Sequence, residues 1–397
     1  MKSITIFTES YPSGKGETFL KEELEHLEKR FDTVLIIPMG IGDADIIWHK
    51  GTRPEVKSGN TRIRTLLRKN WKLMLKIMKY EWRASHNTKY IFKPVHFFKM
   101  LVFSLKKSEQ LHNEIPESSY LYSYWYANWA LSISMLKNIY RPKAKWATRM
   151  HGYDVDVQQT STGYYPFRKW NNQYLNTAIF ISEYGRKLFK KDNVDFTGNL
   201  ELAYLGIDER RMAPMPKGSA FIIVSCSSVL PVKRLDKMAS ILGYLSRRVL
   251  WLHFGDGPGF NLLLKHMAKL PDNIGFEAKG YVKNEDLLQY YLDNEVDLFI
   301  NSSKLEGVPF SMIEAGAHGI PLAGVNICGI PELISKNMGV LMDEKISNKE
   351  NADKLESFLI SQLSRDRNYR ENIRKEVVNK FAAKQNYNKL EKLIIEN

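Results

Sequence analysis

The chain has 397 residues, and 58 Lys and Arg against 44 Asp and Glu give it a formal net charge of +14. Hydrophobic residues make up 44% and charged residues 26%, which excludes a disordered chain and fits two globular domains. The two cysteines, Cys226 and Cys328, exclude a disulfide scaffold and favour a reducing compartment. The sequence contains neither a run of 18 apolar residues nor a signal-peptide pattern, which predicts a cytoplasmic protein without a transmembrane helix.

The first half of the chain predicts an open α/β domain. A turn-rich loop at 10–16 and a charged helical stretch at 17–30 follow the first of several apolar runs. Strand, loop, helix and strand in this order are typical of a doubly wound parallel sheet. The runs of strand length in this half are 4–7, 34–38, 120–124 and 146–148.

The positive charge is concentrated between residues 57 and 107, where 14 Lys and Arg stand against one acid, Glu81, a net charge of +13. Helical spacing places five basic residues on one face, namely Arg68, Lys72, Lys76, Lys79 and Arg83. A neighbouring apolar face contains Leu67, Trp71, Leu75, Met78 and Trp82. Adjacent basic and aromatic faces are typical of a helix that lies on an anionic membrane, so we expect the five basic residues, Trp71 and Trp82 to bind one.

Two other interpretations fit the basic segment. Its apolar face packs on its own domain while the basic face is only solvated, or its interleaved aromatic and basic residues bind nucleic acid. The sequence contains no nucleic-acid recognition motif, so we expect no nucleic-acid partner. We favour the membrane surface over the solvated face.

The second half of the chain predicts another α/β domain. Pro214, Pro216 and Gly218 mark the expected join between the two halves. Open sheets bind ligands beyond the carboxyl ends of their strands, so two such domains predict a ligand cleft. The strand-like runs of this half are 221–225, 249–254, 297–302 and 320–325.

Two glutamates eight residues apart follow the strand predicted at 297–302. Glu306 stands in a loop, Pro309 stands at the expected start of a helix, and Glu314 lies inside that helix. Unpaired N–H groups at a helix start favour a phosphate, and carboxylates bind diols through paired hydrogen bonds. In the alternative interpretation, Glu306 caps the loop and Glu314 is a solvated helix residue.

The stretch Glu306-Gly-Val-Pro-Phe-Ser-Met-Ile-Glu314 resembles the E-x7-E motif of retaining GT-B glycosyltransferases, most closely family four. The segment 181–184 looks like the strand that leaves the first domain of that family, and the segment 149–154 resembles its H-G-x-D motif. Together with three other similar segments, these two occur in the family's order along the chain. The five segments are Tyr11–Phe19, Arg149–Asp154, Ile181–Tyr184, Gly255–Pro258 and Gly329–Glu332.

The resemblance implies an α/β, GT-B fold, in which two Rossmann-like, doubly wound domains face a central cleft. Residues 1–208 would form the acceptor-binding domain, which carries the basic insertion at 57–107. Residues 209–375 would form the nucleotide-sugar-binding domain, and a helix at 376–397 would cross back to the first domain.

The resemblance also implies transfer of a sugar from a UDP- or GDP-sugar with retention of the anomeric configuration. Glu306 would hold the donor sugar, Lys233 would neutralise the leaving pyrophosphate, and His151 would lie beside the reacting sugar. The family uses no catalytic metal, so neither a metal site nor a cofactor is expected. The implied donor-binding residues are Gly14, Gly16, Arg234, Gly255, Gly307, Val308, Pro309, Phe310 and Glu314, the last of these on the ribose.

Together, the resemblance and the basic segment predict a peripheral enzyme on the cytoplasmic membrane face. Its acceptor would be a glycan, such as a polyprenyl-linked oligosaccharide of a surface polysaccharide. One departure from the family is Ser228, which stands where an arginine usually contacts the phosphates. Two alternatives stay open, a nucleotide-sugar epimerase of GT-B fold and an inactive relative that binds membranes or polyanions, which Ser228 favours.

Overall fold

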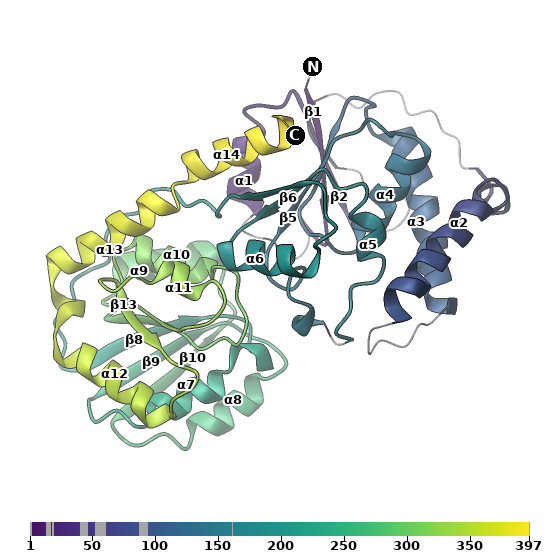
Figure 1. Ribbon diagram of the computed structural model, residues 1–397. Coiled ribbons are helices and arrows are strands. Elements are labelled where there is room, and N and C mark those ends of the chain that lie inside the picture. The colour runs from purple at the N-terminus through teal and green to yellow at the C-terminus, as the bar shows by residue number, and fades with distance from the viewer. Residues whose placement is uncertain are drawn as a thin grey trace. The chain divides into compact units, whose positions relative to one another are not determined.

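A computed structural model describes residues 2–12, 17, 20–39, 47–51, 61–86, 94–160 and 162–396. The chain divides into two compact units, which are described separately below (Figure 1). The first unit contains Met1–Tyr204 together with Asn386–Asn397, and the second unit contains Leu205–Gln385.

The first unit is built on a seven-stranded sheet with the order β3-β2-β1-β4-β5-β6-β7. Its strand pairs are parallel except for β2 and β3, which pair antiparallel. The strands predicted for this half of the sequence are confirmed. The strands are β1 (Ser3–Thr8), β2 (Thr33–Pro38), β3 (Ile47–Lys50), β4 (Tyr120–Ser123), β5 (Trp146–Met150), β6 (Thr177–Phe180) and β7 (Asn199–Leu202).

Helices surround this sheet, and α4 is buried along most of its length against α3. The expectation of a strand at 181–184 is wrong. Ser182 instead caps α6, because its hydroxyl accepts a hydrogen bond from the Gly185 N–H at 3.0 Å. The helices are α1 (Leu20–Leu27), α2 (Ile63–His86), α3 (Pro94–Glu114), α4 (Trp129–Ile139), α5 (Arg168–Asn171), α6 (Glu183–Asp192) and α14 (Ala383–Glu396), which begins in the second unit.

A buried ion pair joins α1 to the sheet. The Glu23 carboxylate and the Arg149 guanidinium approach to 3.3 Å, and both side chains are fully buried. The Tyr122 hydroxyl donates to the second carboxylate oxygen of Glu23 at 2.6 Å. Breaking a buried pair by removing one partner leaves a charge without compensation, so this cluster is an anchor of the first unit.

The second unit contains a six-stranded sheet with the order β10-β9-β8-β11-β12-β13, and all of its strand pairs are parallel. The strands predicted at 221–225, 249–254, 297–302 and 320–325 are confirmed. The strands are β8 (Phe221–Cys226), β9 (Val249–Phe254), β10 (Ile274–Gly280), β11 (Leu298–Asn301), β12 (Leu322–Val325) and β13 (Gly339–Met342).

Helices cover both faces of the second sheet, with α7 and α8 on one side and α9 and α10 on the other (Figure 1). The segment around Pro214 is not a linker between the units, because the Ala213 N–H donates to the His318 carbonyl inside the second unit. The helices are α7 (Leu235–Leu242), α8 (Phe260–Met267), α9 (Asn284–Asp293), α10 (Phe310–Ala317), α11 (Ile330–Leu333), α12 (Asn348–Ile360) and α13 (Arg367–Lys380).

The strand order reverses once in each sheet, between β1 and β4 and between β8 and β11. In open parallel sheets, ligands bind beyond the carboxyl ends of the strands at such a reversal. The loops that follow β8 and β11 contain Lys233 and Glu306, and those that follow β1 and β4 lead to Glu17 and Trp125. The topology therefore places a candidate site at this edge of each sheet.

Candidate functional site

The site of the second unit is centred on an ion pair between Lys233 and Glu306. The Lys233 ammonium lies 2.6 Å from a Glu306 carboxylate oxygen, and the two side chains are 24% and 14% exposed. Lys233 ends the 3₁₀ turn Pro231–Lys233, and Glu306 lies in the loop between β11 and α10. The topology thus brings together two predicted catalytic residues that are 73 positions apart.

Arg234 holds this pair of loops together. Its backbone adopts the left-handed region with φ of 50°, and its guanidinium donates to the carbonyls of Ser302 at 2.8 Å and Ser303 at 3.1 Å. The Ser302 hydroxyl returns a hydrogen bond to the Lys233 carbonyl at 2.8 Å, and Glu344 pairs with the guanidinium. In this conformation Arg234 positions Lys233, and its donor-binding role stays a prediction.

Glu314 lies inside α10 and is buried, so the alternative of a solvated helix residue is wrong. The Asn284 amide donates to its carboxylate at 2.6 Å from the start of α9. Burial of a carboxylate costs free energy unless other groups donate hydrogen bonds to it, as Asn284 does here. Sequence reasoning missed Asn284, because no signal at 30 positions' separation indicates this contact.

The two-glycine turn after β9 brings the backbone close to the loop after β8. A Cβ atom on Gly255, which has φ of 141°, would stand 1.9 Å from the Ser227 carbonyl oxygen. At Gly257, the same atom would stand 2.8 Å from the Val229 carbonyl oxygen. Only glycine fits this approach, so Gly255 supports the loop that carries Lys233.

The start of α10 is formed by the residues predicted to contact the donor sugar. Val308 is buried, Pro309 is the N-cap, and the helix begins at Phe310. Gly307 lies in the loop directly after Glu306. The positive end of the helix dipole therefore lies at the same edge of the sheet as Lys233. Ser228, in place of the arginine of the resembled family, is exposed.

In the first unit, His151 packs in an aromatic cluster after β5. Its ring centroid lies 4.1 Å from that of Trp125 and 4.9 Å from that of Tyr124. Burial and the nearby Arg149 hold the pKa of His151 well below its ordinary value, so the imidazole is neutral at pH 7. A neutral ring can donate or accept a hydrogen bond with a sugar hydroxyl but cannot supply charge.

The Asp154 carboxylate of the predicted H-G-x-D segment organises the two loops around His151. It accepts hydrogen bonds from the backbone N–H of His151 at 2.8 Å and of Tyr126 at 3.0 Å. Burial raises its pKa to about 6. The residue therefore positions His151 through backbone contacts, which connect the ends of β4 and β5.

Gly14 and Gly16 lie outside the described residues. In the same predicted loop, the buried Glu17 carboxylate accepts backbone N–H bonds from Glu9 at 3.0 Å and from Ser10 and Tyr11 at 2.7 Å. The Trp125 indole also donates to Glu17 at 2.7 Å. Sequence reasoning missed this role of Glu17, which fixes the start of the loop after β1.

The predicted basic helix corresponds to α2, which packs on the first unit through Leu66, Met74 and Ile77. The predicted apolar face is split. Leu67 and Met78 of that face pack against the same core, whereas Trp71, Leu75 and Trp82 are 53%, 58% and 50% exposed. The five predicted basic residues are exposed as well. We call these exposed basic and apolar residues together the α2 surface, which consists of Arg68, Trp71, Lys72, Leu75, Lys76, Lys79, Trp82 and Arg83.

Neither a candidate membrane span nor a metal site occurs in the described part of the chain. None of its helices is long and apolar enough to cross a bilayer. Within the same residues, no three His, Cys, Asp or Glu side chains gather closely enough to hold a metal ion.

Comparison with known sequences places a family domain in the second unit. Residues 207–376 match the family glycosyl transferases group 1. The chain is 25% identical, over 233 residues, to a GDP-mannose-dependent alpha-(1-6)-phosphatidylinositol monomannoside mannosyltransferase of Mycobacterium tuberculosis. This match covers 53% of the chain and 59% of that relative, so the chain spans less than two thirds of the curated protein.

Comparison with solved structures covers both units. The lipopolysaccharide outer core galactosyltransferase WaaB aligns with 100% of this chain and 99% of its own, with a TM-score of 0.69 and 12% identity. Anabaena HepE in complex with UDP-glucose aligns with 99% of both chains, with a TM-score of 0.67 and 13% identity. The predicted GT-B fold is thereby confirmed.

Proposed function

We propose that the chain is a glycosyltransferase that transfers a sugar from a nucleotide-sugar to a lipid-linked glycan with retention of configuration, since its residues 207–376 match the family glycosyl transferases group 1 and its fold is GT-B. The observation that carries the proposal is the Lys233–Glu306 pair beside the buried Glu314, at the reversal point of the second sheet. The second unit would bind the donor and the first unit the acceptor.

Each group of the second unit has a distinct task in this reaction. Departure of the nucleoside diphosphate leaves negative charge on its outer phosphate, and the Lys233 ammonium would stabilise that charge. Glu306 would accept hydrogen bonds from the donor sugar, and Glu314 from the ribose. The start of α10 adds the positive end of a helix dipole, which offsets the missing arginine at Ser228.

We propose that the reaction needs no metal, because Lys233 and the helix start supply the positive charge that a divalent cation would otherwise provide. The prediction is that a chelator such as EDTA leaves the rate unchanged. A rate that falls with EDTA and returns with added Mg²⁺ or Mn²⁺ would contradict it.

The lipid-linked acceptor is supported by the α2 surface and by the relative from Mycobacterium tuberculosis, whose name specifies a phosphatidylinositol monomannoside acceptor. Exposed tryptophans next to lysines suit the boundary of an anionic membrane, where indoles enter the interface and ammonium groups meet lipid headgroups. An enzyme held there would meet its acceptor in the plane of the membrane. We therefore propose a peripheral protein on the cytoplasmic membrane face.

The experiment that tests the donor site is a thermal-shift panel of UDP-, GDP- and ADP-sugars. A ligand that binds only the folded protein raises its melting temperature. At a ligand concentration of 100 times the dissociation constant, the free energy of unfolding rises by about 2.7 kcal/mol. We expect UDP- or GDP-sugars to stabilise the chain and Lys233→Ala to abolish the shift. Stabilisation by none of them would refute the donor site.

A further inference from the structure

Asn284 is the first residue of α9 and stands at the same edge of the second sheet as Glu306, because it follows the carboxyl end of β10. Leu287 and Tyr291 of this helix are buried, so packing of α9 fixes the backbone at Asn284. The Asn284 side chain is exposed, and its amide donates to the buried Glu314 carboxylate at 2.6 Å. Asn284 therefore contributes a directed hydrogen bond to Glu314 and little apolar packing.

The amide of Asn284 joins two helices. The N-cap of α9 is Lys283, so Asn284 stands one residue beyond the N-cap position that asparagine favours. Its amide reaches from the start of α9 to Glu314 inside α10, on the side of the sheet that both helices cover (Figure 1). The contact fixes the Glu314 side chain from a different element of the fold.

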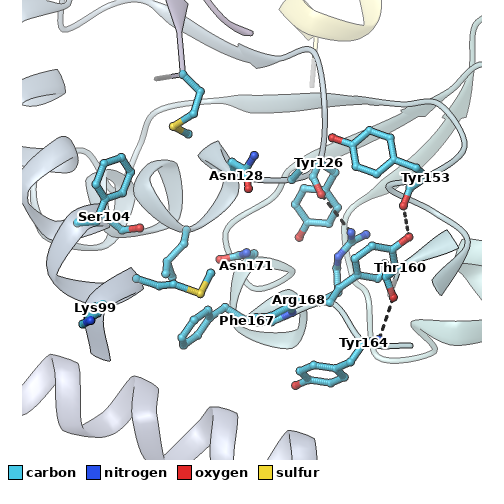
Figure 2. A pocket seen from close by; sticks show the side chains of 17 residues that line it. Lys99, Ser104, Tyr126, Asn128, Tyr153, Thr160, Tyr164, Phe167, Arg168 and Asn171 are labelled. Atoms are coloured by element: carbon cyan, nitrogen blue, oxygen red, sulfur yellow. Dashed lines mark hydrogen bonds between the residues drawn. The ribbon is translucent and has the colours of Figure 1, made fainter. Parts of the chain in front are cut away.

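The first unit contains the same kind of contact. Asn128 is the N-cap of α4, and its amide donates to the Glu9 carboxylate at 2.7 Å. Asn128 also lines a cavity of about 530 Å³ in this unit (Figure 2), and Glu9 directly follows β1. In both units, an amide at a helix start holds a carboxylate of another element. What distinguishes Asn284 is its partner, because Glu314 is the carboxylate predicted to bind ribose.

An amide donor suits this position because it fixes the carboxylate without changing its charge. The last torsion of a glutamate is broad, so its carboxylate turns readily unless a hydrogen bond holds it. Each carboxylate oxygen accepts more than one hydrogen bond, so the bond from Asn284 leaves Glu314 able to accept others. A lysine in the place of Asn284 would neutralise Glu314, and an aspartate would repel it.

We propose that Asn284 is a positioning residue that holds the plane of the Glu314 carboxylate, so that Glu314 accepts both hydroxyls of the ribose at once and the site selects ribonucleotides over deoxyribonucleotides. The inference rests on the proposed function, because that function supplies the nucleotide. A deoxyribonucleotide offers one hydroxyl less. A carboxylate that is held in place cannot turn to compensate for the missing hydroxyl, so preorganisation increases the selectivity.

Calorimetric titration of the full chain tests this role. The ligands are whichever of UDP and GDP the donor panel identifies and its 2′-deoxy form, and the readout is the ratio of the two dissociation constants. The wild type should bind the deoxy form about ten-fold more weakly, because a hydrogen bond to a charged group is lost. Asn284→Ala should lower this ratio to about three-fold or less, mainly by weakening the ribonucleotide, because the carboxylate can then turn.

Two matched controls remove an amide–carboxylate hydrogen bond elsewhere. Gln289→Ala removes the bond that Gln289 donates to Asp293 at 2.9 Å on the same helix, and Asn128→Ala removes the bond to Glu9 in the first unit. Both variants should keep the wild-type ratio. General loosening of α9 would weaken both nucleotides alike and leave the ratio unchanged, so the ratio separates positioning from a structural role.

Asn284→Asp keeps the shape of the side chain and removes the donor. Two carboxylates this close share a proton as the pH falls, and that proton replaces the amide hydrogen. The selectivity of this variant should therefore be lost at pH 8 and return toward pH 5, whereas the wild type keeps it throughout. Cys226 and Tyr291 near Glu314 stay protonated over this range, because burial raises the pKa of the Cys226 thiol to about 12 and holds the pKa of Tyr291 well above its ordinary value.

A double variant shows whether Asn284 acts through Glu314. Glu314→Ala should by itself abolish the selectivity, and the addition of Asn284→Ala should change the ratio no further. A further loss of ribonucleotide affinity in the double variant would overturn the positioning role, because Asn284 would then contact the nucleotide itself. Tighter ribonucleotide binding by Asn284→Ala alone would also overturn it, because the amide would then compete with the ribose for Glu314.

The same titrations separate this inference from the proposed function. If the wild type binds the nucleotide and selects ribose while Asn284→Ala keeps the full ratio, the inference alone fails. If neither UDP nor GDP binds the wild type, the donor site fails and the inference fails with it.

Discussion

Removal of three charges from the α2 surface tests the membrane proposal most directly. Lys72, Lys76 and Lys79 are exposed on one face of α2, next to Trp71 and Trp82. Each basic residue near an anionic bilayer contributes about 1 kcal/mol of binding free energy. Changing the three lysines to Gln should therefore cost about 3 kcal/mol, or roughly 100-fold in the partition coefficient.

The assay is sedimentation with vesicles of phosphatidylcholine containing phosphatidylserine, compared with pure phosphatidylcholine. A change of Lys187, Lys190 and Lys191 to Gln is the matched control, because these exposed lysines carry the same charge on α6 of the same unit. Melting temperatures check folding, since the Lys76 ammonium also lies 5.8 Å from the Trp170 ring centre.

Salt dependence gives a second readout of the same effect. The screening length falls from about 10 Å at 0.1 M salt to about 3 Å at 1 M, so binding of the wild-type chain should fall toward that of the triple variant. Equal sedimentation of the triple variant and the wild type with anionic vesicles at low salt would refute the reasoning. Triple Lys→Glu substitution should weaken binding further than the change to Gln, because it turns three attractions to the bilayer into repulsions.

Three further predictions concern the sites and their support. Lys233→Ala and Glu306→Ala should each lower kcat/KM by about 10²–10³, and the losses should roughly add in the double variant, because the two residues contact different parts of the donor in the transition state; a double variant no slower than either single variant would contradict this. Because the pKa of Asp154 is about 6 in the folded protein against an ordinary 3.8, its proton is held more tightly when folded, so wild-type stability should rise relative to Asp154→Asn by about 2 kcal/mol as pH falls from 7 to 4, and a difference that is constant with pH would contradict it. Glu23→Ala should lower the free energy of unfolding, measured with urea, by about 3–5 kcal/mol, because it leaves the buried Arg149 unpaired. Glu25→Ala, at an exposed position of the same helix, should lower it little. Equal losses for the two variants would contradict the role of the Glu23–Arg149 pair.

The strands were predictable because parallel strands covered on both faces are continuous apolar runs, such as the fully buried 3–8. Contacts between positions that are far apart in the sequence were not predictable. Nothing in the sequence near Arg149 shows that Glu23 neutralises it, and Asn284 lies 30 positions from the carboxylate it contacts. The segment 181–184 follows a strand without continuing it, because Ser182 offers its hydroxyl to the next helix.

The basic helix shows a second limit of sequence patterns. Its periodicity gives an aromatic stripe and a basic stripe, but the residues of α2 that are buried against the domain form a third stripe, which includes Leu66, Met74 and Ile77, and only Leu67 and Met78 of the aromatic stripe join that contact. Periodicity finds apolar faces and does not rank them, because packing depends on what the rest of the chain presents. The buried Glu81 on that third stripe reads as a break in the pattern until Tyr164 is placed opposite it.

Because of the Lys233–Glu306 pair, we expect a nucleotide-sugar and a free nucleoside diphosphate to bind with different compensation for Glu306. The Lys233 ammonium has a carboxylate partner at 2.6 Å, so a diphosphate must compete with Glu306 for Lys233. A nucleotide-sugar compensates the displaced Glu306 with sugar hydroxyls, whereas a nucleoside diphosphate alone leaves that carboxylate without a partner. Replacing Glu306 with Gln should therefore have opposite effects on binding and on transfer.

Glu306→Gln frees the ammonium and should tighten binding of the nucleoside diphosphate by up to roughly five-fold, which corresponds to the ~1 kcal/mol of a partly exposed ion pair. Transfer should fall at the same time, because the amide holds the sugar less strongly in the transition state. Calorimetric titration with UDP or GDP measures the first effect, and turnover of the matching sugar donor measures the second. Weaker diphosphate binding by the Gln variant would show that Glu306 supports the phosphate site and does not compete with it.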